Sequence, residues 1–369
     1  MDEKLKKIIF IVLGCFVILF LFLFMMSSCS SKYSPSKLEK EIIKNAKVYY
    51  KSHKDELPKE NAVTTISLAD LVNKGIIKEL DKILDEDTNC SGTLTIENNN
   101  NYYMYSPSLS CTMPNDTYLS NNLREILIEN VVTSGNGLYL VGDSYYFRGD
   151  KVDNYLILDG VLWRITKINS DNSIRLIEAS RRDPVVWDDR YNAETMATTG
   201  INNFYNNDLN SRIKDNLESI YNSEDIISND LKGFIKETSL CIGKRDSETS
   251  VNDGSIECAT TLDNQYLGLL QLNEYMLASL DSNCLNIKST ACRNYNYLAD
   301  FKNSYWTLTA NSESTSQVYK ISTTVLPTAA SNAGMARLVI NISENTNVTG
   351  AGTEEEPYIV VGLKSETKK

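Results

Sequence analysis

The most uniform part of the hydrophobic pattern lies near the N-terminus. Residues 8–26 (IIFIVLGCFVILFLFLFMM) contain no charged side chain. A helix rises about 1.5 Å per residue, so a run of this length spans roughly one bilayer core. Lys4, Lys6 and Lys7 precede the run, and basic residues stay on the cytoplasmic side of a membrane. The pattern predicts a cytoplasmic tail at 1–7, a transmembrane helix at 8–26, and the remaining chain outside the cell.

The same segment has a second interpretation, as a lipoprotein signal. Met26-Ser-Ser-Cys29 resembles a bacterial lipobox, in which cleavage leaves a lipidated cysteine at the new N-terminus. The apolar run is longer than the roughly 7–15 residues of a signal peptide core, which favours the retained helix. Secretion without an anchor is the third alternative. In the first two cases the protein is tethered at the outer face of a bacterial cell membrane.

Helical and alternating patterns follow the apolar run. Apolar residues recur at helical spacing between 36 and 54, and a second helical pattern begins at Ser67. Residues 92–96 and 102–105 alternate around an asparagine-rich turn, which predicts a β-hairpin. We expect residues 33–112 to fold as a small α+β unit.

Strand patterns dominate the rest of the chain. Alternation on both sides of Asp159-Gly160 predicts a hairpin, and residues 240–295 are rich in loop-forming residues. Residues 201–237 have a helical pattern, with one apolar face formed by Leu209, Ile213, Leu217 and Ile220. Late strand patterns lie at 305–308, 317–321, 336–340 and 358–361. We expect the two ends of a domain at 141–363 to pair in one sheet, with a polar linker at 113–140 and a short tail at 364–369.

The eight cysteines form two groups. Cys15 lies within the apolar run and Cys29 at its outer end, whereas the other six follow it. An even number of cysteines outside the cell predicts disulfides, and the alternative of a zinc site lacks the required close spacing. Pairing of sequence neighbours would give the bridges Cys90–Cys111, Cys241–Cys258 and Cys284–Cys292.

Charge and histidine content exclude several functions. Lys plus Arg is 37 and Asp plus Glu is 48, a net charge of -11. This balance argues against a nucleic-acid partner, because phosphate binding needs an excess of basic side chains. His53 is the one histidine, so we expect neither a histidine-based zinc site nor Ser-His or Cys-His catalysis. No phosphate-binding glycine loop or nucleophile motif is present, which favours binding over catalysis.

The order of the first elements resembles type IV pilin-like proteins of Gram-positive bacteria. An apolar anchor, a helix with AKVYY (46–50), ISLADLVNKGIIKEL (66–80) and a disulfide-closed hairpin carry the resemblance. It implies a pilin-like head at 33–112 and, as an alternative function, a structural subunit or minor pilin of a surface filament. Unlike pilins, the chain has no processing motif before the apolar run and no glutamate inside it. These departures argue against filament assembly.

Residues 141–363 resemble bacterial surface domains with the C-type-lectin-like fold, related to the formylglycine-generating enzymes. The segments that carry this resemblance are YYFRGDKVDNYLILDGVLWRI (145–165), WDDRYN (187–192), GLLQLNEY (268–275), YWTLT (305–309) and ARLVINISENTNVTGAGTEEEPYIV (336–361). The resemblance implies a small twisted sheet under long, ligand-binding loops. In the enzyme branch it implies a redox-active cysteine pair and copper, but each cysteine here is better explained by a local bridge. In the sugar-binding branch it implies calcium held by Glu-Pro-Asn and Trp-Asn-Asp motifs, which this chain lacks.

The candidate ligand-binding stretch is Trp187, Asp188, Asp189, Arg190 and Tyr191. A tryptophan face can stack on a sugar ring, and neighbouring carboxylates can hold Ca²⁺ or sugar hydroxyls. The alternative is that Trp187 covers the core while the two acids are solvated. We expect no metal and no cofactor; the acidic outer part leaves Ca²⁺ open, but no motif names its ligands.

The predicted fold class is therefore α+β, with a membrane helix, a small pilin-like unit and a larger C-type-lectin-like domain with long loops and disulfides. The expected function is that of a surface adhesin or recognition module that binds an extracellular glycan or protein and is not an enzyme. The alternatives are a filament subunit and an enzyme of the formylglycine-generating type. A reactive unpaired cysteine pair would favour the enzyme, whereas three closed bridges would weaken it.

Overall fold

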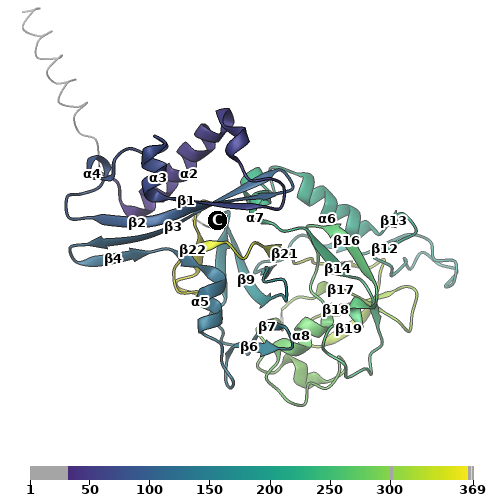
Figure 1. The fold of residues 1–369 in the computed structure, drawn as a ribbon. Coiled ribbons are helices and arrows are strands. Elements are labelled where there is room, and N and C mark those ends of the chain that lie inside the picture. Colours follow the sequence, from purple (N-terminus) through teal and green to yellow (C-terminus); the bar gives the residue numbers. More distant parts are fainter. Residues whose placement is uncertain (1–31, 300–301, 365–366, 368–369) are drawn as a thin grey trace, which may run out of the picture.

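The computed structural model describes residues 32–299, 302–364 and 367. The membrane helix or lipoprotein signal expected at 8–26, and Cys29, lie outside these residues. No helix within the described part of the chain is long and apolar enough to cross a membrane. Figure 1 shows a smaller unit with a four-stranded sheet and a larger unit that contains the remaining sheets.

The helices of the small unit lie on the face of its sheet that points away from the larger unit (Figure 1). Helix α2 (Pro35–Ser52) begins after Ser34, whose side chain accepts a hydrogen bond from the backbone N of Lys37 at 3.3 Å. Its apolar face, predicted from the sequence, is buried and includes Leu38 and Ile42. Ser67 caps α3 in the same way. The other elements here are η1 (Lys54–Glu56), α3 (Leu68–Asn73) and α4 (Leu80–Ile83).

The small sheet is antiparallel, with the order β1-β2-β3-β4. The strands are β1 (Val63–Ser67), β2 (Asn89–Asn99), β3 (Tyr102–Met113) and β4 (Asp116–Leu119). The predicted hairpin is confirmed and extends beyond the alternating segments. Asn100 and Asn101 form its turn with φ of 49° and 67°, a left-handed conformation that asparagine tolerates.

The large sheet has the order β21-β10-β9-β8-β23-β22-β5, and the pair β6–β7 joins it through β9. Strands β8 and β9 form the predicted hairpin, with Asp159 and Gly160 at positive φ in its turn. Late strands pair with early ones: Tyr358 lies opposite Leu156 in a parallel pair, and Ile340 lies opposite Leu176. The prediction that the two ends of this domain share a sheet is confirmed. The strands are β5 (Asn121–Asn122), β6 (Gly137–Val141), β7 (Ser144–Arg148), β8 (Tyr155–Leu158), β9 (Val161–Ile168), β10 (Ile174–Glu178), β21 (Val339–Ile342), β22 (Asn347–Thr349) and β23 (Tyr358–Val360).

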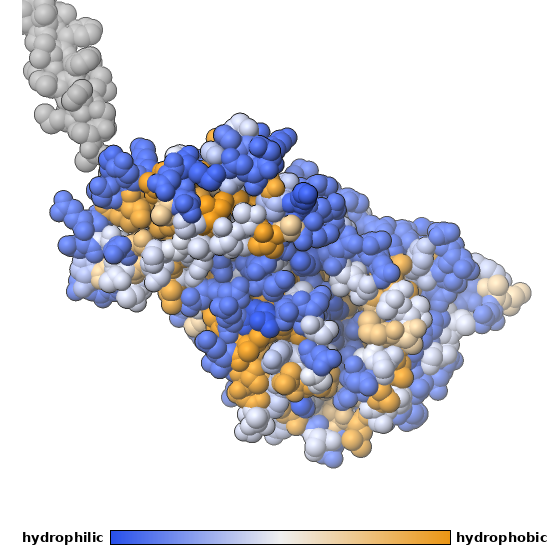
Figure 2. Space-filling model, viewed as in Figure 1, coloured by the Kyte–Doolittle hydropathy of each residue, from blue (hydrophilic) through white to orange (hydrophobic). Residues whose placement is uncertain are grey.

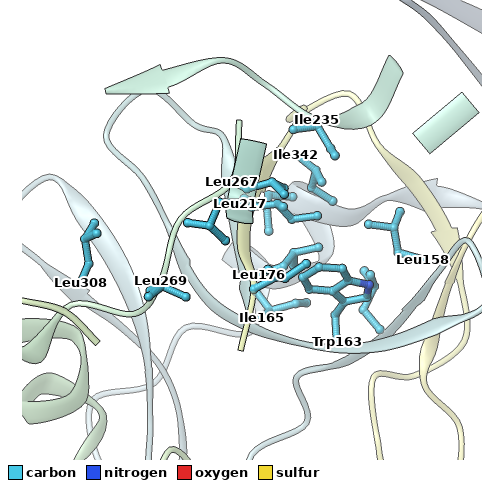
Figure 3. Packing of buried hydrophobic residues seen from close by; sticks show 14 of the residues in the cluster. Leu158, Trp163, Ile165, Leu176, Leu217, Ile235, Leu267, Leu269, Leu308 and Ile342 are labelled. Carbon is cyan, nitrogen blue, oxygen red and sulfur yellow. The ribbon is translucent and has the colours of Figure 1, made fainter. Parts of the chain in front are cut away.

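The core of the larger unit forms where this sheet meets a helix. Figure 3 shows Trp163 and Ile165 of β9 beside Leu176 of β10, close to Leu217 of α6 (Arg212–Asn222). Trp163 and Trp306 are 1% and 0% exposed, so both tryptophans are core residues.

A second group of elements covers the other end of the larger unit (Figure 1). It contains a four-stranded sheet with the order β15-β17-β18-β19 and helix α8 (Leu272–Ala278). The strands of this sheet are β15 (Lys244–Arg245), β17 (Tyr305–Asn311), β18 (Gln317–Ile321) and β19 (Val325–Ala329). The remaining elements are short pairs and helical turns: β11 (Val185–Val186), β12 (Tyr205–Asn206), β13 (Leu209–Asn210), β14 (Thr238–Cys241), β16 (Thr261–Gln265), β20 (Ala333–Gly334), α5 (Leu123–Glu129), α7 (Asn229–Phe234), η2 (Glu257–Ala259) and η3 (Thr290–Arg293).

Two expected segments differ from the structure. Residues 113–140, expected to be a linker, contain β4, β5 and α5, because the polar stretch pairs with strands of both units. The helical face expected within 201–237 begins only after Ser211 and is interrupted between Asn222 and Asn229. Leu209 therefore lies in the β12–β13 hairpin instead of a helix, and it is exposed.

A buried polar junction joins the two units. The side chain of Glu97 from β2 is 2% exposed and forms an ion pair with Lys236 at 3.0 Å. Asn345 Nδ2 donates a 3.1 Å hydrogen bond to the same carboxylate. Helix α7 contacts the backbone of β3 directly, because a Cβ on Gly233 would lie 2.8 Å from the carbonyl oxygen of Tyr103. Hydrophilic side chains dominate the visible outer surface of both units, and apolar ones form separate patches (Figure 2).

Candidate functional site

The tryptophan of the expected binding stretch is part of the core. Trp187 is fully buried, and its ring centroid lies 5.9 Å from that of Phe204 and 6.0 Å from that of Trp306. The indole therefore has no face open to a sugar ring. Its position agrees with the alternative that Trp187 covers the core.

The charged residues beside Trp187 bind one another. Asp188 is buried, and its Oδ1 accepts hydrogen bonds from the backbone N and Nε of Arg190 at 3.0 and 2.9 Å. Asp189 forms an exposed ion pair with Arg212 at 3.1 Å, and Tyr191 is 54% exposed. The structure thus gives Asp188 and Arg190 partners within the fold. In the described part of the chain, no three His, Cys, Asp or Glu side chains are grouped so that they could hold a metal ion.

All three predicted disulfides are present. The bridges Cys90–Cys111, Cys241–Cys258 and Cys284–Cys292 have Cα–Cα distances of 4.0, 4.3 and 4.5 Å. The first joins β2 to β3, in which Cys90 and Cys111 are directly opposite. Because all six of these cysteines are bridged, none of them is a free thiol in this structure.

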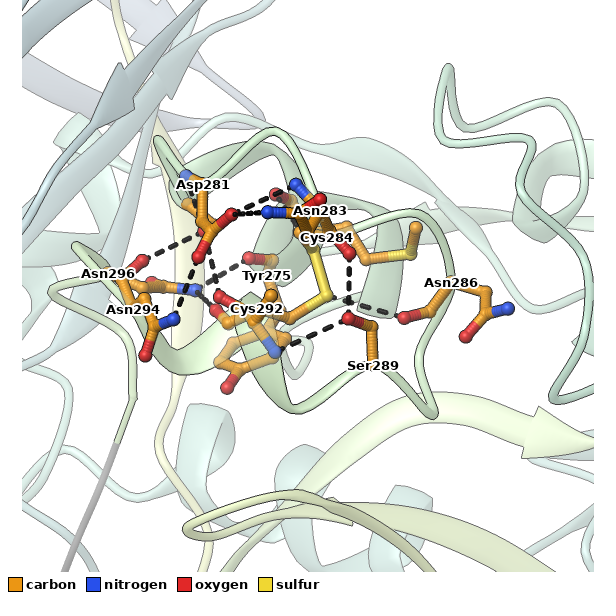
Figure 4. Close-up of a disulfide and its surroundings, with 12 residues drawn as sticks. Tyr275, Asp281, Asn283, Cys284, Asn286, Ser289, Cys292, Asn294 and Asn296 are labelled. Carbon is orange, nitrogen blue, oxygen red and sulfur yellow. Dashed lines mark hydrogen bonds between the residues drawn. A yellow bond between two sulfur atoms is a disulfide. The ribbon is translucent and has the colours of Figure 1, made fainter.

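The Cys284–Cys292 bridge closes a loop that follows α8 (Figure 4). Asp281 accepts hydrogen bonds from Asn294 Nδ2 at 2.7 Å and from the backbone N of Asn283 at 2.9 Å. These bonds, that from Asn294 first, hold the pKa of Asp281 below its ordinary value. Asn296 Nδ2 donates to the carbonyl oxygens of Tyr275 and Cys292 at 2.8 and 2.7 Å. These hydrogen bonds join the loop to itself and to α8, which indicates a structural role.

A concave site lies between α6 and the chain at the end of β16 and just after it. It is a cavity of about 220 Å³. Its apolar floor consists of Phe204, Leu217 and Leu267, which are 3%, 2% and 4% exposed. Ligand sites in proteins are mostly apolar cavities with a few polar groups at defined positions.

Two stacked tyrosines line this cavity. The rings of Tyr221 and Tyr266 lie 4.4 Å apart between centroids, with planes 5° from parallel. Tyr221 follows Leu217 by one helical turn, so the two share a face of α6. Burial, and then the hydrogen bond to Glu237, raise the pKa of Tyr266 to about 12. Burial also raises the pKa of Tyr221, so both phenols are neutral at physiological pH.

Amide side chains form the rim of the cavity. Asn222, Asn264 and Gln265 contribute them, and each amide has both donor and acceptor atoms. Asn264 has a φ of 59° where the pairing of β14 with β16 shifts register, and such irregularities redirect side chains. The two charged residues at the rim, Lys214 and Glu218, form an ion pair with each other. The rim is therefore polar but nearly neutral.

The small unit also reaches this site. Asn100, in the β2–β3 turn, donates hydrogen bonds of 2.6 Å to Tyr266 Oη and to Glu237 Oε2. Lys232 Nζ of α7 lies 5.2 Å from the ring centroid of Tyr221. The two units together fix the position of the tyrosine pair before any ligand arrives.

No local pattern along the chain indicates this site. The period of α6 predicts that Leu217 is buried, but the partner of Tyr221 comes from a distant segment with no helical or strand pattern of its own. Comparisons of this chain with protein-family models, with curated proteins and with solved structures found no significant match.

Proposed function

We propose that this chain is a membrane-tethered protein of the bacterial cell surface whose outer part binds a carbohydrate without chemically changing it. The observation that carries the proposal is the Tyr221–Tyr266 pair beside an apolar cavity with an amide rim. A sugar ring presents a C–H face and a set of hydroxyls. The aromatic and apolar groups suit the first, and the amides suit the second.

Two further observations support an outer location. Three disulfides form and persist in oxidising compartments, which for bacteria lie outside the cytoplasm. The apolar run at 8–26 and the lysines before it favour a position of the folded part on that side. In this proposal the small unit, with its pilin-like order of elements, holds the C-type-lectin-like unit away from the membrane.

The near-neutral rim favours an uncharged ligand. Lys214 and Glu218 neutralise each other, and the tyrosine hydroxyls stay protonated at physiological pH. A strongly anionic glycan would find no unpaired cation among the residues that line this cavity. We therefore assign a neutral sugar residue to the site, held by stacking and by amide hydrogen bonds.

The test uses the full chain, extracted in a detergent without a sugar headgroup and titrated with a panel of neutral methyl glycosides. We expect saturable binding of at least one glycoside, detected by ligand-observed NMR. Tyr221→Ala should weaken it about tenfold or more, because it removes the stacking surface. Tyr191→Ala is the matched control, since it removes an exposed tyrosine from the stretch 187–191.

Two outcomes would contradict the proposal. The first is that no neutral glycoside binds to the unmodified chain. The second is that Tyr191→Ala abolishes binding while Tyr221→Ala leaves it unchanged, which would place the ligand at 187–191.

A further inference from the structure

A second cavity, separate from the tyrosine site, lies beside the Cys241–Cys258 bridge. Its volume is about 150 Å³, and most of the side chains that line it are polar or charged. Strands β9 and β10 supply two cations, Lys167 and Arg175, and the start of α8 supplies Asn273. A polar cavity of this size accommodates a small molecule or a few waters.

The cations at this cavity share a single buried carboxylate. Arg175 Nε lies 2.6 Å from Glu274 Oε1, and Lys167 Nζ lies 3.2 Å from the same oxygen. The side chains of Arg175, Lys167 and Glu274 are 6%, 14% and 1% exposed. Burial lowers the pKa of Lys167 even with the carboxylate beside it. Buried charges are normally paired one to one, so this group has one positive charge in excess.

Another wall of the same cavity presents hydrogen-bond acceptors in place of cations. Asn273 is 2% exposed, and its Oδ1 has no hydrogen-bond partner among the described residues. Asp253 also lines the cavity, and the loop that contains it passes against Asn273, because a Cβ on Gly254 would lie 3.0 Å from Asn273 Nδ2. A buried acceptor without a donor is costly, which indicates that a donor belongs there.

The cavity therefore has a cationic wall and an acceptor wall. Its charged lining residues are Lys167, Arg175 and Asp253, and together with Glu274, which is paired with the two cations, their formal charges sum to zero. Lys167 and Arg175 balance Glu274 and Asp253. A simple anion would neutralise the excess charge of the cationic wall but leave the Asn273 oxygen without a donor. A simple ammonium ion would supply a donor to the acceptor wall but leave the excess positive charge of the cationic wall without a partner. A molecule with both groups on a short spacer satisfies both walls.

We propose that this cavity binds a small amino acid as its zwitterion. The carboxylate contacts Lys167 and Arg175, and the ammonium group donates to Asn273 Oδ1 and faces Asp253. The volume of about 150 Å³ restricts the ligand to the smallest amino acids. This site does not depend on the proposed carbohydrate site and would stand if that proposal failed.

The test is a calorimetric titration of the full chain with glycine and alanine. Acetate and glycinamide are the matched probes, because each keeps one of the two charged groups. We expect saturable binding of glycine that is at least about tenfold tighter than that of acetate or glycinamide. Equal binding of acetate and glycine would overturn the proposal, and so would the absence of glycine binding.

Variants locate the ligand. Lys167→Met should weaken glycine binding about tenfold or more, because it removes a charge-assisted hydrogen bond. Asp253→Asn is the variant least able to disturb folding, since Asp253 is exposed and the amide oxygen can still accept from Ser255. It should weaken glycine binding several-fold and leave acetate binding unchanged. Lys232→Met, at the tyrosine site, should change neither. Glycine binding that none of the cavity variants alters would place the ligand elsewhere and overturn the proposal.

Discussion

Ser343 of the larger unit donates a hydrogen bond to Glu97 of the small unit, inside the junction that joins them. Lys236 and Asn345 bind the same carboxylate, at 3.0 and 3.1 Å. One buried side chain therefore satisfies three groups from the neighbouring unit. The relative position of the units, which the tyrosine site also requires through Asn100, depends on this carboxylate.

Removing the Glu97 carboxylate should destabilise the whole protein. Glu97→Ala leaves Lys236 and Ser343 without their acceptor, and we expect a loss of about 3–5 kcal/mol in the free energy of unfolding. Urea denaturation of the folded chain measures it. Glu60→Ala, at an exposed position, is the control and should change the stability by less than about 0.5 kcal/mol. Equal effects of the two substitutions would show that the junction contributes little.

Substitutions at Trp187 and Tyr221 should affect different properties: Trp187 should matter for stability and Tyr221 for glycoside binding. Trp187→Ala opens a cavity between Phe204 and Trp306, so we expect a loss of roughly 3–5 kcal/mol in stability. The milder Trp187→Phe should keep the fold and the glycoside affinity. Tyr221→Ala should mainly reduce the affinity. Thermal melting and the glycoside titration, applied to both positions, measure the difference. If Trp187→Phe lost glycoside binding but kept its stability, the ligand would bind at residues 187–191 and not at the tyrosine pair.

Glu39 should make stability depend on pH. It is 4% exposed, and burial raises its pKa above the ordinary value, although Tyr118 donates a 2.6 Å hydrogen bond to it. An acid whose pKa is raised in the folded state binds its proton more tightly there. This contribution to stability is fully present below the ordinary pKa of 4.5 and is lost as the pH rises through the raised value.

Replacing Glu39 should remove this dependence. Glu39→Gln keeps an acceptor for Tyr118 and has no charge, so we expect it to stabilise the protein at pH 8 relative to the unmodified chain. At pH 4 the two should be nearly equally stable. Urea denaturation at both pH values measures the effect, and an equal difference at pH 4 and pH 8 would contradict the argument.

The Cys90–Cys111 bridge should stabilise the small unit. Replacing both cysteines with serine frees a loop of 21 residues in the unfolded chain, and we expect a loss of about 2–4 kcal/mol. Chemical denaturation of the double variant measures it. Asn100 still contacts Tyr266 and Glu237 when the small unit is folded, so glycoside binding to the folded double variant should be close to that of the unmodified chain. A folded double variant that no longer binds the glycoside would contradict this expectation and show that the bridge itself is needed to hold Asn100 at the site.

The parts of the fold that the sequence predicted depend on local patterns. The turn at Asp159 and Gly160 and the alternation beside it are enough to define the β8–β9 hairpin. The helical assignment of Leu209 failed because the apolar spacing continued by chance past the true helix start. Asn207 and Asp208 have positive φ and form a turn there, and Ser211 caps the helix two residues after Leu209.

The candidate sites could not be predicted in this way. Tyr221, Tyr266 and Asn100 meet because the two units pack together, and no pattern along the chain encodes that contact. Trp187 shows the opposite case, since its neighbours in sequence suggested a binding site while its neighbours in space bury it. The disulfide pairing was easier to predict from the sequence, because short spacings favour bridges between neighbouring cysteines.

The position of Val361 constrains the order in which the protein can be completed during synthesis. Val361 follows β23 and is buried in the core of the small unit, and a Cβ on the next residue, Gly362, would lie 2.8 Å from Ile43 Cδ1. A nascent chain holds residues 33–112 long before it reaches Val361. The first unit to be synthesised therefore lacks part of its interior until the strand that completes the second unit has emerged. The two units mature together, and a chain stopped before residue 358 would leave both unfinished.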